Sequence, residues 1–187
     1  MDVTWTTGWN LFTSRRLSVG VGVDDELAGL VRAAQRGDGL AMADLLDLLA
    51  PAVGRWCGPI ALQDAPDAAQ EALIAVFRGL SGLRNPAALF GWARAIAVRE
   101  AVRVARRADR ERPAEFDDVP ARDDPMLAVE VRDVLNRLAP EQRAVLVLRD
   151  LDGLDERTVA DVLGTPIGTV KSRLSRARRN FRKGWRR

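Results

Sequence analysis

The stretch DERTVADVLGTPIGTVKSRLSRARRNFRKGWRR, residues 155–187, decides the fold. Residues 155–163 have the pattern of a short helix, residues 164–166 that of a tight turn with glycine and proline, and residues from 167 onward that of a longer helix. Two helices joined in this way form a helix-turn-helix, which places the start of its second helix in the DNA major groove. The sequence therefore predicts a DNA-binding protein.

The second helix of this motif separates apolar side chains from charged ones. Its apolar residues recur at steps of four, three and four, which predicts one inward-facing stripe. The stripe consists of Val170, Leu174, Ala177 and Phe181. Lysine and arginine cover the other faces, and no acidic residue follows Asp161. Cations also suit a helix C-terminus, but the helix dipole acts only on the last turn and leaves a basic face along the whole helix unexplained.

Capping residues mark the starts of both helices. We expect Asp155 to cap the first and Thr165 to cap the second, because their side-chain oxygens accept backbone N–H groups. Pro166 suits the first helical turn, where its missing N–H costs nothing. Ala160 is small enough to let the two helices approach closely.

The composition indicates a binding protein. Apolar residues make up 47% of the 187 residues, and the net charge is only +3. No uninterrupted apolar run approaches the roughly 18 residues of a membrane span. The single cysteine, Cys57, excludes an internal disulfide and is expected to be a small core residue. Because histidine is absent, the chain lacks the usual general base and the commonest metal ligand. These features predict a soluble cytoplasmic protein that is not an enzyme and uses no cofactor or metal.

The first 23 residues differ from the rest. They carry Trp5, Trp9 and Phe12 without a helical or alternating period. The sequence SRRL at 14–17 superficially resembles a twin-arginine export signal, but the apolar stretch after it is short and leads directly into acidic residues. We expect residues 1–23 to be a disordered extension or the product of a misassigned start codon, with a partner-binding segment as the less favoured interpretation.

Residues 24–107 predict a compact domain of four amphipathic helices with short connections. Aspartate or asparagine stands at the expected helix starts, including Asp38, Asp64 and Asn85. The third helix carries Val76 and Phe77 at helical spacing, which predicts that both are core residues.

One face of the fourth helix carries arginines at steps of four, three and four, namely Arg99, Arg103, Arg106 and Arg110. Such a row can follow a phosphate backbone, and each contact releases condensed counterions. A second nucleic-acid surface is therefore predicted. The alternative is a solvated face in which Glu100 and Asp109 pair with these arginines.

Residues 108–125 are rich in acidic residues and proline, and such a segment cannot bury enough surface to fold alone. It is predicted to be a flexible linker. Residues 126–187 contain two further helical patterns and the helix-turn-helix. The predicted fold class is all-α, with two small helical domains joined by an acidic linker.

Four sequence motifs resemble those of the extracytoplasmic-function (ECF) group of bacterial RNA polymerase sigma factors. They are DAPDAAQE at 64–71, FGWA at 90–93, LAPEQR at 138–143 and GTVKSRLSRAR at 168–178. The last is the most specific, and the resemblance covers about residues 24–182. It makes residues 24–107 correspond to sigma region 2, which binds core polymerase and the minus-10 element, and residues 126–187 to sigma region 4, which binds the minus-35 element.

The resemblance implies a promoter-recognition subunit without catalysis of its own. Candidates for core-polymerase binding are Asp64, Asp67, Gln70, Glu71 and Arg78. Candidates for opening and reading the minus-10 element are Ser81, Arg84, Asn85, Trp92, Arg94, Arg99 and Arg103. Candidates for reading the minus-35 element are Thr169, Lys171, Ser172, Arg173, Ser175 and Arg176. The implied partners are core RNA polymerase, promoter DNA and a cognate anti-sigma factor, and the free protein is expected to be a monomer.

Two other functions fit parts of the sequence. A helix-turn-helix repressor would use only the C-terminal half and would bind a palindrome as a homodimer. A metal-dependent nuclease would use Asp64, Asp67 and Glu71, which share a helix face and have the ligand type that Mg²⁺ prefers. The same acids also suit a helix N-terminus, and protein contact is the favoured role for them.

Overall fold

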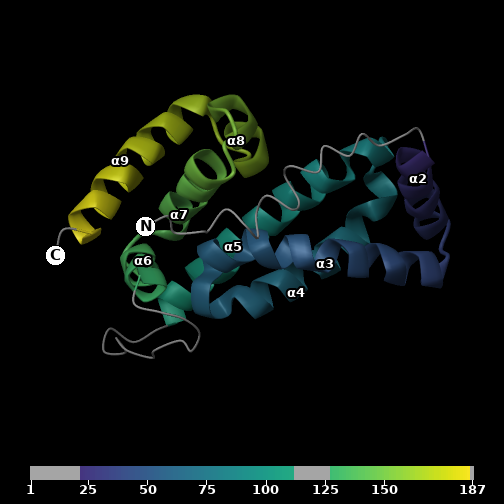
Figure 1. Ribbon diagram of the computed structural model, residues 1–187, viewed down its shortest axis with the longest axis horizontal. Coiled ribbons are helices and arrows are strands. Elements are labelled where there is room, and N and C mark those ends of the chain that lie inside the picture. The colour runs from purple at the N-terminus through teal and green to yellow at the C-terminus, as the bar shows by residue number, and fades with distance from the viewer. Residues whose placement is uncertain (1–21, 112–126, 186–187) are drawn as a thin grey trace.

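The computed structural model describes residues 22–111 and 127–185, and within these ranges every regular element is helical. Most of the predicted extension and linker therefore lie outside the described residues. Figure 1 shows an elongated molecule in which helices α2–α5 form one end and helices α6–α9 the other. We call these parts the N-terminal unit, residues 22–111, and the C-terminal unit, residues 127–185.

The N-terminal unit contains the four predicted helices. They are α2 (Gly22–Gln35), α3 (Gly39–Ala61), α4 (Ala65–Gly79) and α5 (Leu89–Glu111). Three 3₁₀ turns lie between them, at Leu62–Asp64, Leu80–Gly82 and Pro86–Ala88. The predicted caps at Asp38 and Asn85 are confirmed, since each side chain accepts a backbone N–H, although Asn85 opens a 3₁₀ turn and not α5 itself. Asp64 precedes α4 as predicted, but its side chain makes no capping hydrogen bond, so that prediction was wrong.

Helix α5 is longer than predicted. It continues to Glu111, four residues beyond the expected end at Arg107. The added residues include Ala108 and Arg110, both good helix formers, and the first proline that could stop the helix is Pro113. The sequence placed the end of the helix too early because the acidic composition of this segment indicated a linker.

The stretch from Gly39 to Gly82 is long and apolar enough, by length and composition, to cross a membrane. Core helices of globular domains meet the same criterion, and 44% of its most apolar window is buried inside the fold. Leu45, Leu49 and Ile60 are completely buried and belong to one core with residues of the neighbouring helices. We therefore assign this stretch to the core of the N-terminal unit.

The C-terminal unit consists of α6 (Leu127–Asn136), α7 (Pro140–Leu146), α8 (Glu156–Leu163) and α9 (Ile167–Trp185). A π-helical turn, η4 (Val147–Leu151), extends α7. The sequence predicted one continuous helix through Leu148, and only the type of its last turn differs.

The turn of the helix-turn-helix is held by Asp155 and Gly164. The Asp155 carboxylate accepts the backbone N–H groups of Arg157 and Thr158 at 2.9 and 3.0 Å, so the predicted cap is confirmed. The backbone N–H and hydroxyl of Thr158, followed by the backbone N–H of Arg157, lower the pKa of Asp155. Gly164 ends α8 with a left-handed φ of 62°.

Thr165 does not cap α9, so that prediction was wrong. Its hydroxyl oxygen is buried without a hydrogen-bond partner. The carbonyl of Pro166 instead accepts the N–H groups of Thr169 and Val170 at 2.8 and 3.1 Å. The packing of the turn, and not the residue type, therefore decides which way the Thr165 side chain points.

The left-handed backbone of Gly164 leads to a stability prediction. Gly164→Ala should lower the free energy of unfolding by about 1–2 kcal/mol, because a Cβ strains the left-handed conformation. Gly168→Ala is the matched control. Both sites have open space around an added Cβ, but Gly168 lies inside α9 without a positive φ, so alanine should stabilise it by about 0.5–1 kcal/mol. Urea unfolding of both variants measures the difference, and equal shifts of the same sign would contradict this account of the turn.

The two units pack directly against each other. Helix α5 contacts α7 and α8, and α3 contacts α7. Val98 of α5, Val145 of α7 and Val159 of α8 are completely buried members of one continuous apolar core. The sequence predicted two separate domains and gave no sign of this contact.

Candidate nucleic-acid interface

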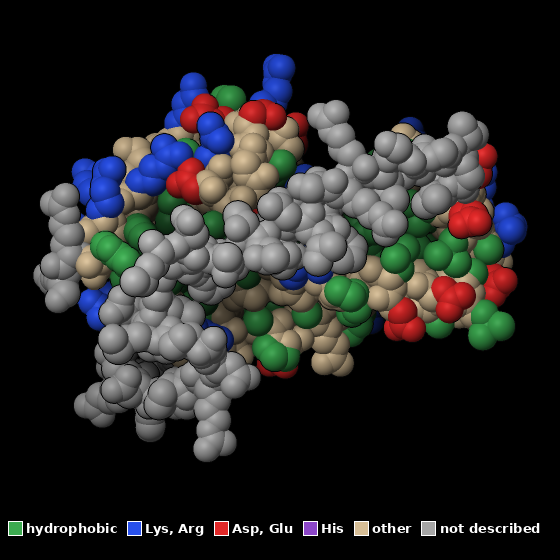
Figure 2. Space-filling view, viewed as in Figure 1, with side chains coloured by type: hydrophobic (Ala, Val, Ile, Leu, Met, Phe, Trp, Pro, Cys, Tyr) green, Lys and Arg blue, Asp and Glu red, His purple; other side chains and the backbone are tan. Residues whose placement is uncertain are grey.

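Helix α9 has the predicted division into an apolar and a basic face. Val170 and Ala177 are completely buried, and Leu174 is 4% exposed. Phe181 is half-buried and stacks on Trp185, with ring centroids 6.1 Å apart. Figure 2 shows lysine and arginine side chains gathered over the end of the molecule formed by α8 and α9.

The six minus-35 candidates occupy the N-terminal half of α9. Lys171, Ser172, Ser175 and Arg176 are exposed, whereas Thr169 and Arg173 are half-buried.

Arg176 is oriented along its own helix. Its Nε donates to the carbonyl of Ser172 at 3.3 Å, and its guanidinium also lies 3.3 Å from the Ser172 hydroxyl. The Ser172 hydroxyl in turn donates to the carbonyl of Thr169 at 3.1 Å. These contacts point Arg176 back toward the start of α9, which is the end that enters a major groove in this motif.

Some cations of α9 have a structural task that the sequence did not reveal. Arg178 forms two hydrogen bonds with Asp150 of η4, at 3.0 and 2.5 Å, and these bonds raise the pKa of Arg178. Asn180 donates to Gln142 of α7 at 3.2 Å. The C-terminal half of α9 is therefore tied to the rest of its unit, and the first half carries the candidate DNA-reading residues.

The predicted minus-10 loop is exposed and internally braced. Ser81, Arg84 and Asn85 are exposed. Gln35 of α2 donates to the carbonyls of Leu80 and Leu83 at 2.9 and 2.8 Å and so fixes the loop from behind. Gln35 was missed from the sequence because the residues it contacts lie 45 and 48 positions away.

Trp92 is half-buried against α4. A Cβ added at Gly79 would lie 3.2 Å from its ring, so the two helices approach closely at this point. Only part of the indole surface is open to a nucleic-acid base.

Two of the minus-10 candidates face the C-terminal unit. The guanidinium of Arg99 donates to the carbonyl of Val162 at 3.1 Å. Arg94 interacts electrostatically with Asp152 of the C-terminal unit. Burial raises the pKa of Asp152, and the positive charge of Arg94 opposes that rise. The sequence assigned Arg94 and Arg99 to DNA, and that role stays a prediction, since the structure shows only that both face the C-terminal unit.

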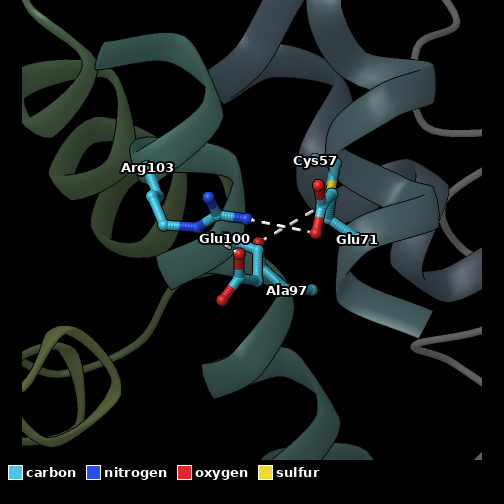
Figure 3. A network of polar contacts seen from close by, with 5 residues as sticks. All are labelled: Cys57, Glu71, Ala97, Glu100 and Arg103. Atoms are coloured by element: carbon cyan, nitrogen blue, oxygen red, sulfur yellow. Dashed lines mark hydrogen bonds and ion pairs between the residues drawn. The ribbon is translucent and has the colours of Figure 1, made fainter. Parts of the chain in front are cut away.

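Arg103 joins helices α4 and α5. Its guanidinium contacts Glu100 at 2.6 Å and Glu71 at 3.3 Å, and the hydrogen bond to Glu100 is the main cause of its raised pKa. Figure 3 shows these contacts beside Cys57, whose thiol donates to the carbonyl of Ala97 at 3.6 Å. Burial, supported by the charge of Glu100, raises the pKa of Cys57 to about 12, so it is the expected inert core residue.

The core-polymerase candidates surround an apolar strip on α4. Asp67, Gln70 and Arg78 are exposed, whereas Asp64 and Glu71 are half-buried. Between them Ile74 is 38% and Phe77 is 53% exposed.

The prediction that Phe77 is a core residue was therefore wrong, because helical spacing places it at the edge of the stripe formed by Val76 and Leu80. Large exposed apolar side chains with a charged border are typical of protein-contact surfaces.

Among the described residues, no group of acidic side chains is arranged to hold a metal ion.

The arginine stripe of α5 lines a pocket of about 320 Å³ between the two units. The stripe therefore shares one face, as predicted, but that face is turned toward α8 and α9. Arg106 also forms an ion pair with Glu141 of α7. The lining residues are Arg99, Val102, Arg103, Arg106, Arg110, Glu141, Leu163, Thr165 and Arg173.

Residues 128–181 match the family model described as sigma-70, region 4. The ECF RNA polymerase sigma-E factor of Escherichia coli is 32% identical over 134 residues, which cover 62% of this chain and 70% of that protein. The chain belongs to the ECF RNA polymerase sigma factor family.

Two further ECF sigma factors are similar over a comparable share of the chain. SigE of Mycolicibacterium smegmatis is 35% identical over 131 residues, or 64% of this chain and 51% of the relative. SigM of Mycobacterium tuberculosis is 38% identical over 120 residues, or 62% and 61%. The matches thus span between half and two thirds of these two relatives.

Two solved structures share the fold of this chain. The sigma factor RpoE in complex with the anti-sigma factor NepR, from Bartonella quintana, aligns with a TM-score of 0.60 and 24% identity, covering 77% of this chain and 96% of that one. CnrH in complex with the cytosolic domain of CnrY aligns with a TM-score of 0.56 and 22% identity, covering 82% and 93%. These likenesses confirm the predicted all-α fold.

Proposed function

We propose that this protein binds core RNA polymerase in the cytoplasm and directs it to specific promoters, without catalysis or a cofactor of its own. The observation that carries the proposal is the helix-turn-helix with its exposed basic α9, built on the sequence at 168–178 that resembles ECF sigma factors. In this proposal the C-terminal unit acts as region 4 and reads the minus-35 element, and the N-terminal unit acts as region 2 and opens and reads the minus-10 element.

The chemistry of α9 supports a role in base reading. Arginine can form two hydrogen bonds to a guanine edge, and serine, threonine and lysine can hold phosphates. The exposed side chains of Lys171, Ser172 and Arg176 provide this combination at the start of the helix. Val170 and Leu174 lock α9 onto its unit, so these groups stand on a rigid element.

Helix α4 supports a role in polymerase binding. Its exposed strip of Ile74 and Phe77 is bordered by Glu71 and Arg78, so an apolar contact and charged contacts are available on one face. The minus-10 role is proposed for the exposed 81–85 loop, for Trp92 and for the arginines of α5. Since Arg94 and Arg99 face the C-terminal unit, promoter binding requires the two units to separate.

An anti-sigma factor is proposed as a further partner. RpoE, which shares this fold, was solved in complex with the anti-sigma factor NepR, and CnrH, which also shares it, was solved in complex with the cytosolic domain of CnrY. The free protein is proposed to be a monomer, because its helix-turn-helix serves one promoter element and needs no second copy for a palindrome.

Run-off transcription tests the proposal. Core polymerase from the same organism, supplemented with the purified full chain, should produce one transcript of defined length from a cognate promoter and none without the chain. Size-exclusion chromatography should give a monomer that binds the promoter duplex weakly without core. A stable homodimer that binds a palindrome tightly without polymerase would instead establish a repressor.

A further inference from the structure

The pocket between the two units has an unusual lining. Five of its residues are arginines, and one, Glu141, is acidic. Four of the arginines come from α5, and Arg173 comes from α9, so each unit supplies positive charge to the same space. Glu141 offsets part of this charge through its ion pair with Arg106, and Arg103 is paired with Glu100 and Glu71, but the lining keeps an excess of positive charge that an anion would offset.

The existing contacts use only part of the donor capacity of these arginines. Each guanidinium has five N–H donors. Arg99 donates one to the Val162 carbonyl, Arg106 pairs with Glu141, and Arg110 donates from Nε to the carbonyl of Arg106 at 3.2 Å. Arg103 is engaged by Glu100 and Glu71, so Arg99, Arg106, Arg110 and Arg173 are the lining arginines with most donors left for a ligand.

A second observation comes from the turn of the helix-turn-helix. Thr165 lines the same pocket, and its hydroxyl oxygen is buried without a hydrogen-bond partner in the structure. Buried polar groups are rarely left unpaired, and each such group calls for an explanation. The hydroxyl oxygen is closed to solvent in this conformation, so a rotation of the Thr165 side chain would bring it to an oxygen-rich ligand in the pocket.

The size of the pocket restricts the ligand. About 320 Å³ corresponds to roughly ten water molecules at about 30 Å³ each. A DNA duplex is too wide to enter, whereas a chain of two or three phosphate groups fits. Arginine is the side chain best suited to phosphate, because its planar fork forms paired charge-assisted hydrogen bonds.

We propose that this interunit pocket binds a compact polyphosphate anion, such as the triphosphate group of a nucleotide, and that the bound anion fastens the C-terminal unit onto the N-terminal unit. Arg99, Arg103 and Arg173 are also promoter-binding candidates, so the filled pocket holds them away from DNA. The binding site itself does not depend on the proposed function, but this regulatory consequence does.

Titration calorimetry with the full chain and sodium tripolyphosphate, at constant ionic strength, tests the site. We expect one anion per chain. Arg110→Gln should weaken binding about tenfold or more, the loss typical of one hydrogen bond to a charged group. The matched control is Arg107→Gln, an exposed arginine one turn earlier on α5 that does not line the pocket. It should leave the affinity within about twofold, the size of a distant surface-charge effect.

Three results would overturn the proposal. The first is no saturable binding of tripolyphosphate. The second is an equal loss of affinity in the Arg107 and Arg110 variants, which would indicate general charge attraction. The third is equally tight, Arg110-dependent binding of a single-stranded oligonucleotide, which would assign the pocket to nucleic acid.

A distance measurement tests the fastening separately from promoter activity. Fluorescent labels on α4 and α9 should report a shorter, narrower distance distribution when tripolyphosphate is added, and Arg110→Gln should abolish that change. If run-off transcription fails while this response persists, the proposed function is wrong and the site stands. An unchanged distribution at saturating tripolyphosphate would contradict the fastening role.

Discussion

Replacing Leu49 with alanine is expected to lower the free energy of unfolding by about 2–5 kcal/mol, the largest effect of any substitution considered for this protein. Leu49 is completely buried in the core formed by α3, α4 and α5, so the truncation removes apolar contacts and leaves a cavity. Urea unfolding of the full chain, followed by circular dichroism, measures the loss.

The neighbouring residue provides the control. Leu48→Ala is the same substitution one position earlier on α3, but the side chain of Leu48 is 46% exposed. Leu48→Ala should change the unfolding free energy by no more than about 0.5 kcal/mol, as is usual for surface substitutions. Comparable losses in both variants would mean that α3 does not present the face described here to the core.

Arg176→Ala is expected to reduce discrimination between an intact and a scrambled minus-35 element by about 1–3 kcal/mol, the contribution of one bidentate arginine contact. Arg176 is exposed, and its contacts with Ser172 already direct it toward the start of α9. Promoter competition with the assembled polymerase complex measures the discrimination. Binding to core polymerase should not change, because the core candidates lie on the other unit.

Arg179→Ala is the matched control on the same helix. Arg179 is exposed but lies outside the minus-35 candidates, in the half of α9 that is tied to its own unit by Arg178 and Asn180. It should weaken binding to both promoters equally, as expected for loss of a phosphate contact. Equal use of intact and scrambled minus-35 elements by the unmutated protein would contradict the reading role of α9.

Local patterns predicted the elements of this fold, and the reason is physical. Asp155 and Asp38 cap helices because a cap depends only on residues two or three positions away. The buried stripe of Val170, Leu174 and Ala177 follows from helical spacing alone.

Other features depend on residues that are distant in sequence or on the exact boundary of a helix, and local patterns did not predict these. Spacing assigned Phe77 to the core, but the edge of a stripe is buried only if a neighbouring helix covers it. Spacing predicted that the arginines of α5 share a face, but it gave no sign of what packs against that face, because Val162, which accepts from Arg99, lies 63 positions away. Thr165 is a residue type that often caps helices, but α9 begins at Ile167, so its N-cap position falls on Pro166. Periodicity shows which residues share one face of a helix, but it does not show what packs against that face.

The packing of the two units matters most for function, and it was not foreseen. The sequence predicted two domains that act apart, and the acidic segment between them lies largely outside the described residues. The structure joins them through Arg99, through Arg106 with Glu141, and through a shared apolar core. Under the proposed function, binding to two promoter elements requires this contact to open.

DNase footprinting on a cognate promoter tests the central claim most directly. The account predicts that the protein and core polymerase together protect both the minus-35 and the minus-10 elements, and that Arg176→Ala selectively weakens minus-35 protection. The protein alone should protect neither element. The same protection without polymerase, or protection of a single symmetric site, would contradict the account.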